Sequence, residues 1–118
     1  MNNAFINKDP RSPDPCVWVV TNPINIFHND QDINWKLIGS VDLVNWAPNV
    51  DPPIVFGPAW TGGVPIRVAN PGAQDWIQVT GPGPAGPNPV TYAYTAHITV
   101  TGCPAVIQIA GSVINQPT

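Results

Sequence analysis

Proline and glycine divide this chain into short segments, which constrains the fold more than any other feature of the sequence. The 118 residues include 16 Pro and 10 Gly. A proline inside a helix removes a backbone donor and clashes with the preceding turn. Between these breaks the sequence is rich in Val, Ile, Thr and Trp, which favour short strands and are joined by turns. The chain is therefore predicted to be all-β with almost no helix.

Apolar runs alternate with turn signals about every 8–12 residues, which is the spacing of a sandwich or barrel. The predicted strands are 17–21, 24–28, 33–38, 41–46, 54–56, 65–69, 76–80, 91–101, and 105–109 with a short continuation at 112–114. These elements indicate a single antiparallel β-sandwich of about 7–9 short strands, immunoglobulin-like or related.

Period-two alternation assigns an inner and an outer face to the predicted strands, because successive side chains of a strand point to opposite sides. In 91–101, one face carries Tyr92, Tyr94, Ala96, Ile98 and Val100, and the other carries threonines and His97. The same pattern places Trp35 in the core. Residues 17–20 are apolar on both faces, so this strand is predicted to be central or to contact a partner chain.

A chain of this length is predicted to form one domain. The first fifteen residues contain Pro10, Pro13 and Pro15, so they are predicted to form an extended arm (1–15) beside a β-sandwich domain (16–118). Phe5 and Ile6 in that arm are candidates for packing on a neighbouring copy.

The stretch GPGPAGPNP at 81–89 lies between two predicted strands. Because the chain is too short to be divided there, a stiff hairpin loop is favoured over a linker. A functional alternative is a proline-rich ligand for an aromatic groove, with Pro84 and Pro87 in a P-x-x-P arrangement.

Only 9% of the residues are charged, Glu is absent, and the net charge is −3. The four basic residues are scattered, which argues against nucleic acid as a partner. No apolar run approaches the roughly 18 residues of a membrane helix, and residues 1–15 do not resemble a signal peptide. We therefore expect a cytoplasmic protein by default, with export without a cleaved leader as the alternative. A weakly charged surface favours association.

Three segments carry a resemblance at the level of pattern: INWKL at 33–37, TYAYTAHITV at 91–100 and GSVIN at 111–115. Together they resemble a loose class of small, mostly uncharacterised bacterial β-sandwich proteins, similar in outline to immunoglobulin-like or cupredoxin-like domains. The resemblance implies a fold and no activity. A blue-copper site is excluded, because neither His nor Met follows Cys103 as such a site requires.

Cys16 and Cys103 are predicted to form either a disulfide or two buried thiols. Together with His28 and His97 they are the residue types of a Cys₂His₂ zinc site, but no two of the four have the short sequence spacing that such a site requires. Asp30, Asp32 and Asn34 alternate as at the start of an EF-hand loop, yet Trp35 occupies the glycine position and no Glu follows. We therefore expect no metal and no cofactor, with an irregular calcium loop as the remaining alternative.

Catalysis is not expected, because no nucleophile elbow or paired-carboxylate spacing is present. The first functional hypothesis is a non-catalytic interaction module, a homo-oligomer or a protein with a protein partner, because of its low charge and open sheet edges. The alternative is a carbohydrate-binding module in which exposed indole rings stack on sugars and polar groups bind the hydroxyls. Its candidate residues are Trp60, Asn70, Gln74, Asp75 and Trp76.

Overall fold

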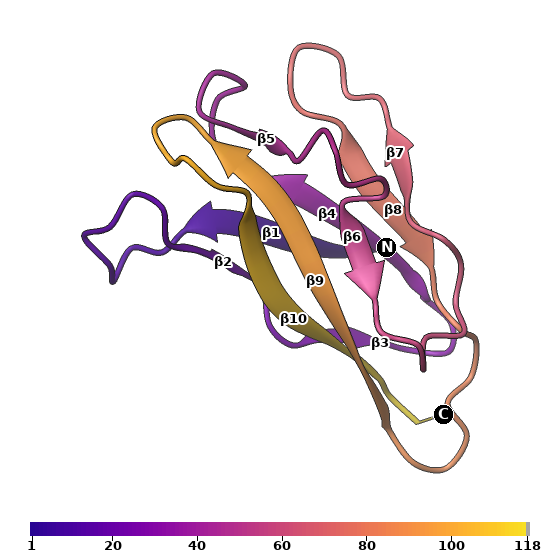
Figure 1. Ribbon diagram of the computed structural model, residues 1–118. Coiled ribbons are helices and arrows are strands. Elements are labelled where there is room, and N and C mark those ends of the chain that lie inside the picture. The colour runs from indigo at the N-terminus through magenta and orange to yellow at the C-terminus, as the bar shows by residue number, and fades with distance from the viewer. Residues whose placement is uncertain (118) are drawn as a thin grey trace.

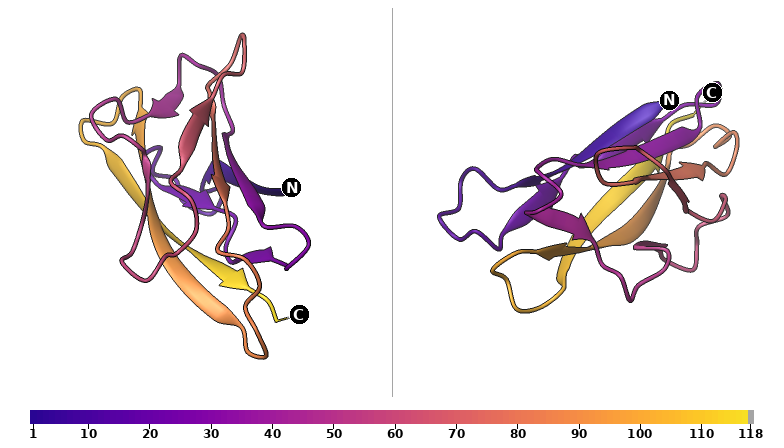
Figure 2. Two further views of the ribbon diagram at one scale, coloured as in Figure 1. Left: turned by 90° about the vertical axis from the view of Figure 1, so that its right-hand side faces the viewer. Right: turned by 90° about the horizontal axis from the view of Figure 1, so that it is seen from above.

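Ten strands form two five-stranded sheets in the computed structural model, which describes residues 1–117. No described residue lies in a helix, so the all-β prediction is confirmed. Figure 1 shows the long β9–β10 hairpin in front, and Figure 2 shows the two layers from the side and from above.

The strand order places residues from both halves of the sequence in each sheet. Sheet A runs β2 (Trp18–Val20), β1 (Asn2–Lys8), β4 (Asp32–Leu37), β8 (Trp76–Thr80) and β7 (Ile66–Val68). Sheet B runs β3 (Ile24–Ile26), β10 (Ile107–Asn115), β9 (Val90–Val100) and β5 (Val44–Trp46), and β6 (Ile54–Phe56) pairs with β9 beside β5. All nine predicted strand segments are found, with β6 and β8 at their predicted bounds.

The predicted arm at 1–15 is wrong for residues 2–8, which form strand β1 inside sheet A. β1 pairs antiparallel with β2 and parallel with β4. Ala4 and Ile6 are fully buried, so Ile6 is a core residue and does not face a neighbouring copy, whereas Phe5 points outward and is 40% exposed. The prolines that suggested an arm all follow the strand, in the loop between Lys8 and Trp18, where they remove no ladder hydrogen bond.

Two strand pairs are parallel, which corrects the prediction of a purely antiparallel sandwich. β1 is parallel to β4, and β10 is parallel to β3. Parallel neighbours need a crossover connection. Between β1 and β4 the crossover contains β2 and β3, and between β3 and β10 it contains β4 to β9.

β2 is an edge strand, which excludes the central position that was one of the two predictions from its apolar sequence. Trp18 and Val20 point into the core, while Val17 is 37% exposed at the edge. Its free edge faces β10, and a cleft of about 500 Å³ lies between them, lined by Trp18, Val20, Gln108 and Ala110 among others.

The hydrophobic core lies between the sheets and is built from the inward-facing residues that alternation predicted. Trp35 is fully buried, and its ring meets Tyr94 edge-on at 5.3 Å between centroids. In β9, residues 94, 96, 98 and 100 are buried and their neighbours are not. This confirms the predicted faces of the longest strand.

β10 is continuous, whereas the sequence predicted a break between 109 and 112. Gly111 pairs with Tyr94 of β9. A side chain at 111 would collide with the Tyr94 ring, which lies directly on the glycine. The glycine therefore makes room for an aromatic ring from the neighbouring strand.

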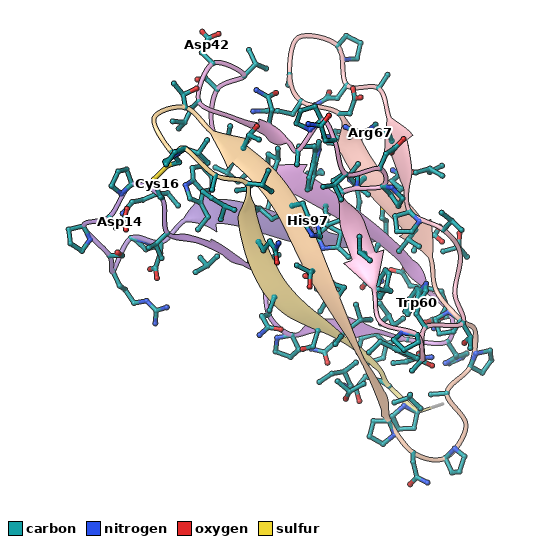
Figure 3. All side chains as sticks on the ribbon, in the orientation of Figure 1. Asp14, Cys16, Asp42, Trp60, Arg67 and His97 are labelled. Carbon is teal, nitrogen blue, oxygen red and sulfur yellow. A yellow bond between two sulfur atoms is a disulfide. The ribbon has the colours of Figure 1, made fainter. Side chains whose placement is uncertain are left out.

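Cys16 and Cys103 form a disulfide with a Cα–Cα distance of 5.8 Å, which resolves the two alternatives left open by the sequence. The bond joins the segment before β2 to the β9–β10 turn (Figure 3). Further along this edge, Asn22 Oδ1 accepts hydrogen bonds from Ser112 N at 3.0 Å and Oγ at 2.8 Å.

Residues 81–89 form a loop that passes from β8 in sheet A to β9 in sheet B, at the end of the molecule near the C-terminus (Figure 1). Its first half is held by Gln31, whose backbone carbonyl accepts from Gly81 N at 3.0 Å and whose Oε1 accepts from Gly83 N at 2.9 Å. Asn115 Nδ2 donates to Gly83 O at 2.8 Å. Pro84, Pro87, Asn88 and Pro89 are exposed.

Candidate functional site

The predicted sugar-binding residues do not converge on one site. Trp76 begins β8, whereas Trp60 lies near the other end of that strand, where Gly62 stands between the Trp60 ring and Thr80 O. Because a strand rises about 3.4 Å per residue, the two ends of this five-residue strand lie roughly 14 Å apart. The two tryptophans therefore cannot form one stacking platform.

The polar members of the predicted sugar-binding set stabilise the loop before β8. Gln74 is buried, and its Nε2 donates to Gly39 O at 3.0 Å and Val44 O at 2.9 Å. Asn70 Nδ2 donates to Gln74 O, and Asp75 O accepts from Trp46 Nε1 at 2.8 Å. These contacts account for the presence of the polar residues, so no ligand is needed to explain them.

Trp76 lies on the outer face of sheet A, and the Lys36 ammonium stands over its ring at 4.6 Å from the centroid. This cation–π contact occupies one face of the Trp76 ring.

Trp60 belongs instead to a stack of aromatic rings at one end of the molecule (Figure 3). It stacks on Phe56 at 3.9 Å with an interplanar angle of 9°, and it meets Tyr92 edge-on at 5.0 Å. Its Nε1 donates to Gly63 O at 2.9 Å, which fixes the ring orientation.

An open groove borders these rings and is referred to below as the aromatic groove. It has a volume of about 280 Å³ and is lined by Gly57, Pro58, Ala59, Trp60, Thr91, Tyr92 and Ala93. No lining residue is charged. Sequence reasoning assigned Tyr92 to the core face, but the start of β9 extends beyond the end of β6, so the ring is half-exposed. The spacing of Phe56 and Trp60 around a Gly-Pro turn is the signal that could have indicated the groove.

The outer face of sheet B, referred to below as the B face, is the second surface of note. It consists of the side chains that alternate with the buried ones: Asn25, Asn45, Val55, Thr91, Ala93, Thr95, His97, Thr99, Gln108, Ala110, Ser112 and Ile114. None of these is Asp, Glu, Lys or Arg. By contrast, the outer face of sheet A carries both Asp32 and Lys36.

Small residues leave a hollow in the middle of the B face. Its volume is about 350 Å³, and its lining includes Gly57, Ala93, Ala110 and Val55, of which Val55 is 45% exposed. Gly57 and Ala93 also line the aromatic groove. The B face and the aromatic groove are therefore continuous.

The acidic residues considered for calcium serve other contacts. Asp30 Oδ2 accepts from the N-terminal ammonium at 2.9 Å. The backbone carbonyls of Asp30 and Asp32 both accept from Asn2 Nδ2, and Asn34 is buried on the outer face of β4. Within residues 1–117, no three His, Cys, Asp or Glu side chains are close enough together to hold a metal ion.

The histidines and cysteines do not form a common site. His28 is exposed in a turn, while His97 donates from Nδ1 to Pro53 O at 3.0 Å. Because Cys16 and Cys103 are joined to each other, neither is a thiol nucleophile in this state.

Two ionisable groups are perturbed by their surroundings. Hydrogen bonds from the Arg11 backbone N–H and side chain hold the pKa of Asp9 below its usual value. Burial raises the pKa of Tyr94 to about 12, and the neighbouring Trp35 indole offsets only part of this increase. Tyr94 lies in the core and Asp9 begins the β1–β2 loop, so neither group faces the aromatic groove.

No protein-family model matches the chain, and comparison with curated proteins gives no match. In the described part of the chain, no helix is long and apolar enough to cross a membrane.

Proposed function

We propose that this protein is a non-catalytic module that associates with a second copy of itself through the B face. The observation that carries the proposal is the absence of any Asp, Glu, Lys or Arg among the outward side chains of sheet B. An uncharged face can approach an identical face without bringing like charges together or leaving a buried charge unpaired.

The size of the B face supports the proposal. The eleven residues of β9 extend roughly 37 Å, and four strand widths span roughly 19 Å, which gives at most about 700 Å² per copy. This area is close to the roughly 800 Å² that each partner contributes to a standard stable interface.

The shape of the B face also supports self-association. Ala93 and Ala110 permit close approach of a second sheet, since facing sheets pack about 10 Å apart. The hollow beside them accommodates an apolar side chain, and exposed Val55 on its rim is available to enter the same hollow on a partner. A two-fold axis would make this contact reciprocal.

Size-exclusion chromatography with light scattering, over a wide range of protein concentration, tests the proposal. We expect a dimer of about twice the 12.6 kDa chain mass. Ala110→Lys should give a monomer, because the interface would then bury two unpaired ammonium groups. Asn7→Lys adds the same charge on the outer face of sheet A and is the matched control. A wild-type monomer at every concentration, or a dimer insensitive to Ala110→Lys, would contradict the proposal.

Carbohydrate binding at the aromatic groove is the alternative. It is supported by Trp60 and Tyr92, but Phe56 covers one face of the Trp60 ring and reduces the area available for stacking on a sugar. A broad glycan panel probed with wild-type protein and with Tyr92→Ser separates the two functions. Saturable binding of one glycan class, lost in the variant, would favour the alternative.

We also infer a non-reducing compartment, because structural disulfides persist outside the reducing cytosol. The Cys16–Cys103 bond supports export over the cytoplasmic default. When cells are quenched in acid and the protein is then alkylated, both cysteines should stay unlabelled until a reductant is added. Rapid labelling without reductant would contradict this inference.

A further inference from the structure

We propose that the tip of the 81–89 loop of one copy docks in the aromatic groove of a second copy, so that the two copies exchange loops. This inference rests on the proposed self-association and names a specific contact within it. The tip consists of Pro87, Asn88 and Pro89, all of which are exposed.

The chemistry of the groove matches the loop tip. Grooves lined by aromatic rings bind prolines, because proline rings pack on aromatic faces and their restricted backbone loses little entropy on binding. Trp60, Tyr92 and Pro58 line the groove, and no charge lies on either the groove or the loop. The volume of about 280 Å³ is near the lower limit of ligand pockets, which suits a short segment.

The docking unit is the tip and not the whole proline-rich stretch. The sequence predicted a P-x-x-P ligand from Pro84 to Pro87, but Gly86 has a φ of 85°. A polyproline helix needs a φ near −75° at each residue, so the stretch bends at Gly86. Pro87 to Pro89 follow this bend as a separate exposed segment.

In this structure the tip of the loop does not line the groove of its own copy. Gln31 and Asn115 bind Gly81 and Gly83, and these contacts join the loop to the β3–β4 connection and the end of β10. The groove lies at the opposite edge of β9, beside the end of β6. Because the tip leaves its own groove open, a second copy can supply the prolines.

The positions of the loop and the groove determine the symmetry of the exchange. Both lie at the same end of the molecule, since the loop leads directly into Thr91 and Tyr92 of the groove (Figure 3). If two copies pack through their B faces around a two-fold axis parallel to β9, the end of each copy that carries the loop and the groove lies beside the same end of the other copy. The exchange then closes after two copies and does not continue into a fibre.

Titration of the isotope-labelled protein with a capped peptide of residues 80–90 tests the groove directly. The indole N–H signals of the five tryptophans report the contact, and Trp60→Phe assigns the Trp60 signal while keeping an aromatic ring on Phe56. We expect the Trp60 signal to shift saturably. A peptide with Pro87→Ala and Pro89→Ala, and a peptide of residues 9–15 with the chain's other proline cluster, should not shift it.

Light scattering of the matching protein variants tests the exchange. Replacing Pro87 and Pro89 by Ala should weaken dimerisation at least tenfold, whereas replacing Pro10 and Pro13 by Ala should not change it. Tyr92→Ser should reproduce the loss, with circular dichroism confirming that each variant is folded.

The outcomes separate the two proposals. A dimer unaffected by the loop and Tyr92 variants, with no peptide binding, overturns loop exchange and leaves self-association through the B face intact. A wild-type monomer at every concentration overturns both. A Trp60 shift that is equal for all three peptides shows unspecific contact and also overturns loop exchange.

Discussion

The Cys16–Cys103 disulfide is expected to supply a large fraction of the stability of this protein. It joins residues separated by 87 positions. In the chain-entropy model, closing a loop of that length in the unfolded chain stabilises the fold by about 4.6 kcal/mol at 25 °C. Since domains of this size have unfolding free energies of roughly 5–15 kcal/mol, loss of the bond should leave a marginal fold.

The position of the bond adds to this expectation. It joins the segment before β2 of sheet A to the β9–β10 turn of sheet B, near the cleft lined by Trp18 and Ile109. The same two sheet edges are also joined by the hydrogen bonds of Asn22 with Ser112.

Urea unfolding followed by tryptophan fluorescence measures the effect. A fourth sample serves as the control, and the three samples compared are oxidised wild type, wild type with a phosphine reductant, and the double variant Cys16→Ala/Cys103→Ala. We expect the last two to lose about 4–5 kcal/mol, which corresponds to a Tm lower by about 15–20 °C. Their urea m-values should rise, because the unlinked unfolded chain exposes more surface.

The double variant with reductant is the control, because its midpoint should not change. A loss below about 1 kcal/mol on reduction would refute the loop-entropy reasoning for this bond.

Four further predictions concern the packing of the fold. Ile6→Ala should destabilise the protein by about 2–5 kcal/mol, because Ile6 is fully buried; a loss below about 0.5 kcal/mol in urea would mean that β1 is not part of the core. Gly111→Ala should cost about 1–3 kcal/mol, because its Cβ meets the Tyr94 ring, and Gly111→Ala with Tyr94→Leu should recover part of that loss. Gln74→Ala should cost about 1–3 kcal/mol by leaving the buried Val44 carbonyl without its Gln74 donor, whereas Gln74→Glu at low pH, where the side chain is protonated, should recover part of that loss. Tyr94→Phe should change stability by less than about 1 kcal/mol, because within residues 1–117 the Tyr94 hydroxyl has no hydrogen-bond partner. The substitution should also remove the absorbance change that accompanies ionisation of Tyr94 near pH 12. In the wild type, the free energy of unfolding should fall between pH 10 and 12, because Tyr94 ionises at a lower pH in the unfolded chain than in the folded one.

The sequence predicted the strands well because their signal is local. Alternation within β9 and the Pro and Gly residues between segments depend only on neighbours in the chain, and they indicated the correct faces of β9 and every break except the one predicted at Gly111. The prediction failed for β1 because three prolines in the following loop outweighed the alternation of Ala4 and Ile6. Parallel pairing of β1 with β4 is a long-range property that no local pattern encodes.

For the candidate sites, too, local features were predicted correctly and long-range contacts were not. Trp60 was correctly placed in an irregular segment, but its partners Phe56 and Tyr92 come from two strands whose pairing the sequence did not reveal. Gln74 was assigned to a ligand because it lies near Asp75 and Trp76 in the sequence, and only the fold shows the two carbonyls that its side chain binds.

The position of β10 between β3 and β9 determines the order in which the protein can be completed during synthesis. All strands of sheet A are present once residue 80 has left the ribosome, whereas β3 has no partner in sheet B until residues 107–115 emerge. The nascent chain therefore carries every strand of sheet A before sheet B can be completed, and part of the apolar side of sheet A stays uncovered until β10 arrives. During that interval it is most exposed to misassembly with other nascent chains.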